Sequence, residues 1–113
     1  MEAIAEARIE KSYLETLRLF GEVDELVNEA VEQYLTNRII ERIRLARKKV
    51  RKYERTYGTN YATFSQRVQL DEGYYNQVNQ DNSLWEQDAL EWMYWDEEVR
   101  DWTERLESIL SES

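Results

Sequence analysis

The constraint that most narrows the fold of this chain is a stretch of some 30 residues that contains neither Gly nor Pro. From Val23 to Tyr53, apolar residues recur at spacings of three, four or five, and Gly58 is the first residue able to end the pattern. This spacing predicts one long helix with an apolar stripe along it. Such a helix is long for a globular protein, so we expect its stripe to pack against another chain.

Composition excludes several classes of function. The 113 residues include no Cys and no His, which removes disulfide bonds, thiolate metal sites and the commonest general acid–base residue. The sequence also lacks a Gly-rich phosphate loop and a nucleophile–His pair. We therefore expect a protein that acts by binding and not an enzyme, with no cofactor and no metal site.

The sequence also bears on location. No run of residues approaches the ~18 apolar positions of a membrane span. The acidic start, Met1–Glu2, lacks the positive charge with which a signal peptide begins. These features predict a cytoplasmic protein without a membrane partner.

Residues 2–10 fit two structures. Apolar residues fall at the odd positions from Ala3 to Ile9, as in a half-buried strand, although Ala, Glu and Arg favour a helix. Ser12–Glu15 has the spacing of a capping box, which would start a short helix there and end it at Gly21. A strand over residues 2–10 is therefore the favoured interpretation.

The second half of the chain divides into three segments. Residues 58–70 predict a short helix, and residues 71–82 read as a polar, turn-rich linker. Ser83–Glu86 is a second capping box and opens a final helix over residues 83–113. Together with residues 1–57, these segments predict a mainly α fold: a short N-terminal strand, a short helix, a long helix and a C-terminal helical extension.

Charge is arranged in three blocks. Residues 1–37 hold nine acids and three bases, a net charge of −6, and residues 38–55 hold nine bases and two acids, a net charge of +7. Residues 56–113 hold thirteen acids and three bases, a net charge of −10. We expect the acidic ends to attract the basic middle, preferably within the protein itself. Bases that could instead contact nucleic acid are Arg8, Lys11, Arg47, Lys48 and Arg51.

The final helix carries the strongest candidate for a partner-binding site. Its four Trp fall on one apolar stripe edged with carboxylates, a pattern that fits the groove of a basic protein. The same Trp could equally form the protein's own core. The candidate partner-binding residues are Trp85, Trp92, Trp95, Trp102 and Leu106, with the acidic rim Asp88, Glu91, Glu98 and Asp101.

Two segments resemble the ribbon-helix-helix antitoxins of type II toxin–antitoxin systems. The first is AIAEARIEKSYLETLRLFGEVDELVNEAVEQYL, and the second is KYERTYGTNYATFSQRV followed by a Trp-bearing acidic helix. The resemblance implies a homodimer built on a β-ribbon of paired N-terminal strands and on the second helices. It also implies that the C-terminal part blocks a small basic toxin, most often a ribonuclease. Candidate dimerisation residues are Ile9, Leu14, Leu17, Val23, Leu26, Val27, Ala30, Ile39 and Ile43.

The DNA-binding side of that resemblance is disfavoured. Family members that read an operator meet phosphates near the strand and at the turn before the second helix. Here those places hold Glu2, Glu6, Glu22, Asp24 and Glu25, which would repel phosphate. The leading hypothesis is therefore an antitoxin-like neutraliser of a basic protein. The alternatives are a ribbon-helix-helix transcriptional regulator and a self-associating helical scaffold.

Overall fold

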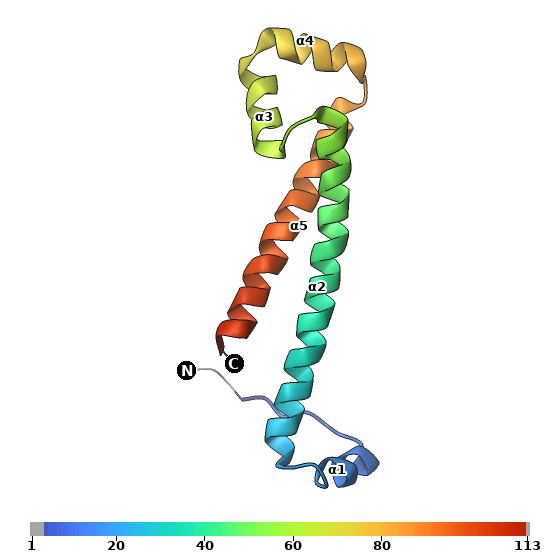
Figure 1. The fold of residues 1–113 in the computed structure, drawn as a ribbon, viewed down its shortest axis with the longest axis vertical. Helices are drawn as coiled ribbons and strands as arrows, with labels where there is room; N and C mark the ends of the chain where they lie inside the picture. The colour runs from blue at the N-terminus through green and yellow to red at the C-terminus, as the bar shows by residue number, and fades with distance from the viewer. Residues whose placement is uncertain (1–3, 113) are drawn as a thin grey trace. The chain divides into compact units, whose positions relative to one another are not determined.

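The computed structural model describes residues 4–112, and its regular structure there is entirely α-helical (Figure 1). The helices are α1 Lys11–Leu17, α2 Val23–Tyr57, α3 Tyr61–Leu70, α4 Glu72–Asp81 and α5 Trp85–Glu112. The chain divides into two compact units, an N-terminal unit of residues 1–35 and a C-terminal unit of residues 36–113. The boundary between them falls inside α2.

The predicted N-terminal strand is wrong. Residues 4–10 form no strand, and residues 2 and 3 of that prediction lie outside the described residues. A strand needs a neighbour to pair its backbone, and a segment rich in Ala and Glu has little preference for the extended state. The mainly α part of the fold class is confirmed for residues 4–112, whereas the β-ribbon, and with it the ribbon-helix-helix architecture, is not.

The first two helices begin in different ways. α1 begins at Lys11, one residue before Ser12, and its N-cap Glu10 makes no side-chain cap bond. α2 is the long helix that the apolar spacing predicts, and Glu22 caps it. The Glu22 carboxylate accepts hydrogen bonds from the backbone N–H of Asp24 at 3.1 Å and of Glu25 at 2.8 Å. A negative charge also suits this end of a helix.

The segment expected to be a linker, residues 71–82, instead forms α4. Asp71 caps it, because its Oδ1 accepts the backbone N–H of Tyr74 at 3.0 Å. Val78 is buried and Tyr74 packs against the core, so tertiary burial overrides a polar composition. Just before α5, Asn82 Oδ1 accepts the backbone N–H of Leu84 at 3.0 Å, and α5 begins at Trp85, two residues after Ser83 of the predicted capping box.

In the C-terminal unit, α5 runs beside the final part of α2 while α3 and α4 lie at the end where α2 stops (Figure 1). The core cluster takes one buried residue from each of these four helices, namely Tyr53, Phe64, Val78 and Trp92. Closer to the start of α2 than Tyr53, the side chains of Ile39, Ile43 and Ala46 are also buried. This part of the predicted stripe is therefore buried within the protein itself, without a second chain.

Two glycines give a matched test of backbone conformation. Gly58 ends α2 with φ +72, which L side chains rarely adopt, whereas Gly73 lies inside α4. We expect Gly58→Ala to lower the free energy of unfolding by about 1 kcal/mol. Gly73→Ala should raise it by about 0.5 kcal/mol, because its Cβ would meet Asp71 Oδ1 at an ordinary 3.4 Å. Urea unfolding measures both, and equal effects of the same sign would contradict this account.

Candidate protein-binding surfaces

Trp92 is the centre of the core. Its side chain is 0% exposed and stacks on Tyr57 and Tyr53, with ring centroids 5.6 and 6.0 Å away. Two rings of α3 complete the enclosure: Tyr61 meets it edge-on at 5.5 Å, and Phe64 lies at 5.2 Å. Trp92 therefore serves the protein's own core, the alternative that the sequence left open, and it is not accessible to a partner.

The remaining Trp residues keep part of their surface in solvent. Trp85, Trp95 and Trp102 are half-buried, as is Leu106. Trp85 Nε1 donates to Asn79 Oδ1 at 2.9 Å, and Lys49 Nζ lies 5.9 Å from the centre of the Trp95 ring. The predicted apolar stripe is thus divided between a closed core and partly open edges.

Part of the predicted acidic rim binds within the protein. The Tyr53 hydroxyl donates to Glu91, and the Tyr57 hydroxyl donates to Asp88 at 2.7 Å. Asn82 Nδ2 donates to both Tyr57 and Asp88, at 2.9 and 3.1 Å. These bonds tie α5 to α2 and to the end of α4, so Asp88 and Glu91 have a structural role. Hydrogen bonds to charged groups of this kind typically contribute about 1.5–3 kcal/mol.

The same contacts change the acidity of two tyrosines. Burial, followed by the hydrogen bond to Glu91 and the charges of Glu91 and Asp88, raises the pKa of Tyr53 to about 12. Burial and the hydrogen bond to Asp88 likewise raise the pKa of Tyr57. Each hydroxyl therefore holds its proton more tightly in the folded protein than in the unfolded chain.

A pH dependence follows from these two tyrosines. The extra stability is fully present below pH 10, where unfolded tyrosine stays protonated, and it is lost as the pH rises through about 12. We expect Tyr53→Phe and Tyr57→Phe to reduce the fall in unfolding free energy between about pH 9 and pH 11. Urea unfolding at several pH values measures this, with the exposed Tyr75→Phe as the control. A slope unchanged by either core substitution would contradict it.

Truncation of Trp92 tests its place in the core. We expect Trp92→Ala to lower the free energy of unfolding by about 3–5 kcal/mol, the usual cost of removing a buried large aromatic side chain. Trp102→Ala should cost about half as much, because that side chain is only half-buried. Urea unfolding followed by circular dichroism compares them, and a larger loss at Trp102 would place the core elsewhere.

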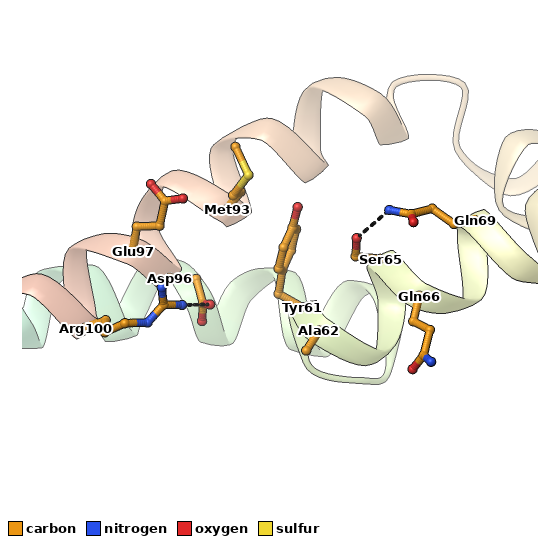
Figure 2. Close-up of a pocket in the computed structure, with 9 residues that line it drawn as sticks. All are labelled: Tyr61, Ala62, Ser65, Gln66, Gln69, Met93, Asp96, Glu97 and Arg100. Carbon is orange, nitrogen blue, oxygen red and sulfur yellow. Dashed lines mark hydrogen bonds and ion pairs between the residues drawn. The ribbon is translucent and has the colours of Figure 1, made fainter.

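A groove lies between α3 and α5 (Figure 2). Figure 2 shows the Tyr61 ring standing at its centre, with one polar pair on either side. Gln69 Nε2 donates to Ser65 Oγ at 3.3 Å, and Arg100 pairs with Asp96 at 3.5 Å. Each pair lies within one helix, and Ala62 and Met93 add apolar atoms to the lining, so the groove presents a mixed polar and apolar surface.

The N-terminal unit has an open apolar surface. Between residues 4 and 35, where the structure describes this unit, no side chain is buried. Leu19 is 83% exposed and Phe20 is 78% exposed, and Ile4, Tyr13, Val31 and Tyr34 are also largely open. The candidate dimerisation residues divide accordingly. Ile39 and Ile43 are buried, Leu14, Leu17, Val23, Leu26 and Val27 are half-buried, and Ile9 and Ala30 are exposed.

Among residues 4–112, no ion pair joins the basic middle of the chain to its acidic C-terminal end. All nine bases of residues 38–55, here called the basic run, are exposed. The ion pairs that the described residues make with one another join neighbours on one helix: Lys11–Glu15, Arg38–Glu41 and Arg100–Asp96. Of the candidate nucleic-acid contacts, Arg47, Lys48 and Arg51 lie in this run, while Arg8 and Lys11 are exposed in the N-terminal unit.

Across residues 4–112, no cluster of three or more potential metal ligands is placed to hold an ion. Over that range, too, none of the helices has the length and apolar character needed to cross a membrane. Comparison of the chain with protein-family models, with curated proteins and with solved structures finds no match.

Proposed function

We propose that this protein acts by binding other polypeptide chains and that it self-associates through its N-terminal unit. The observation that carries the proposal is the contrast between the two units. The C-terminal unit closes around Trp92, whereas residues 4–35 bury no side chain while presenting several large apolar ones. Several large exposed apolar side chains within one short unit are a feature expected of an interaction surface.

Energetics support a partner for this unit. Full burial of one Leu, Val or Phe side chain is favourable by about 1.5–3 kcal/mol. Residues 4–35 obtain little of that energy alone, yet fixing the backbone costs about 1–2 kcal/mol for each residue. A second copy is the simplest partner, because in a symmetric dimer each copy can cover the apolar surface of the other.

A pair of substitutions tests self-association. We expect the full chain to be at least a dimer at micromolar concentration, with a mass of twice 13.7 kDa or more by light scattering. Phe20→Asp with Val31→Asp should shift it to the monomer, because a charge at an apolar interface without a partner costs several kcal/mol. Leu84→Asp is the matched control: it is similarly exposed but lies in the C-terminal unit, so the mass should not change.

The outcome is decisive in either direction. A wild-type mass near 13.7 kDa would end the proposal of self-association. A dimer that survives Phe20→Asp with Val31→Asp but dissociates with Leu84→Asp would place the interface in the C-terminal unit.

A second candidate function is antitoxin-like capture of a basic protein by α5. Its support is charge: α5 holds ten acids and two bases, a net charge of −8, and most of these acids, including Asp101 and Glu104, are exposed. Trp92 takes no part in this version, because the core encloses it. A short basic reading frame beside the gene would favour this candidate, and its absence would favour self-association alone.

A further inference from the structure

We infer that the N-terminal unit of one copy docks on the C-terminal unit of a second copy, along the exposed stripe Arg42, Leu45, Lys49 and Lys52. This docking stripe follows one face of α2, since its members are three or four residues apart. The inference rests on the proposed self-association. It goes further by identifying the surface of the second copy to which the N-terminal unit binds. Charge and apolar character support it separately.

The charges of the two surfaces are complementary. Residues 4–35 carry eight acids and three bases, a net charge of −5, and their side chains are exposed or half-buried. The basic run carries nine exposed bases against Glu41 and Glu54. The ion pairs that residues 4–112 make with one another do not include Arg42, Lys49 or Lys52 of the stripe, so no carboxylate of those residues lies within 4.0 Å of them. Complementary patches of this size attract each other and suppress other pairings.

The stripe also borders an apolar depression. Lys49 lines it together with Leu90, Tyr94 and Trp95 of α5. Leu90 is 65% exposed and Tyr94 is 48% exposed. Glu91 also lines the depression and accepts the Tyr53 hydroxyl, while the Tyr94 hydroxyl donates to Glu98. The surface therefore offers apolar area beside positive charge, and the N-terminal unit offers apolar side chains beside negative charge.

The arrangement of α2 favours a second copy as the occupant. Side chains on one helix meet at separations of three or four residues. Glu25 and Glu29 of α2 have no base of the basic run at either of these separations in the sequence. Two copies that exchange N-terminal units use the same contact twice, which closes the assembly as a dimer.

Charge reversal gives a test in which failure and success are both visible. The base-reversed chain carries Arg42→Glu, Lys49→Glu and Lys52→Glu. The acid-reversed chain carries Glu25→Lys, Glu29→Lys and Glu32→Lys. Each chain alone should dimerise at least about tenfold more weakly than wild type, because like charges then face each other. Mixed in equal amounts, the two should form a dimer about as readily as wild type, because both exchanged contacts regain opposite charges.

A control chain separates this stripe from the rest of the basic run. Arg44→Glu, Lys48→Glu and Arg55→Glu make the same change in net charge on a different face of α2. Light scattering should show it dimerising more strongly than the base-reversed chain, and circular dichroism should show all variants equally helical. For wild type, raising the salt from about 50 mM to about 500 mM should weaken dimerisation several-fold, because salt screens exposed charges.

Each of the other possible results contradicts the inference, and each identifies which step of it is wrong. A monomeric wild type removes the proposed function itself. A dimeric wild type whose base-reversed chain is also dimeric leaves self-association intact and rejects this surface, as does a mixture that stays monomeric. Titration with labelled duplex DNA tests the alternative that the basic run binds nucleic acid. Sub-micromolar binding at about 150 mM salt, lost equally in the base-reversed and control chains without a change in mass, would assign the basic run to nucleic acid.

Discussion

The fold of the C-terminal unit depends on the enclosure of Trp92. Its ring touches Tyr53 and Tyr57 of α2 and Tyr61 and Phe64 of α3, while Trp92 itself belongs to α5. A single large side chain thus fixes three helices against one another, and its Nε1 gives up a hydrogen bond to do so. Offset and edge-on ring contacts add to the energy of burial, so few other apolar residues are needed.

Polar contacts around this cluster set which residues of α2 and α5 lie opposite each other. Tyr57 meets Asp88, Tyr53 meets Glu91, and Lys49 lies over Trp95. The numbers fall on α2 as they rise on α5, so the two helices run antiparallel. Two carboxylates of α5, Asp88 and Glu91, thus bind tyrosine hydroxyls of α2, while Lys49 and Lys52 of α2 lie over the rings of Trp95 and Tyr53. Within residues 4–112, the contacts between these two helices are therefore hydrogen bonds and ring contacts, and the ion pairs lie within single helices.

The sequence indicates where helices form, but it does not indicate which segments their apolar faces pack against. The 3.6-residue spacing identifies α2, α3 and α5, since each buries one face. It misses α4, because Gly73 and the Asn residues indicate turns and only Tyr74 and Val78 report a buried face. It places Trp92 on the correct stripe but does not say which chain covers that stripe. The residues that tie α5 to α2 could have been suspected, because buried Tyr hydroxyls usually need an acceptor.

The N-terminal strand fails for a different reason, and the failure bears on the proposed interface. Alternation at residues 3–9 is a weak signal, because Ala is small and Glu and Arg are tolerated on an open surface. Without paired strands, the apolar side chains of residues 4–35 have no sheet or core to cover them within that unit. What remains is an acidic, apolar helical segment attached to a closed, partly basic unit. In the proposed dimer, the basic run of one copy supplies the positive charge that matches the acidic N-terminal unit of the other, and the same contact covers apolar side chains of residues 4–35.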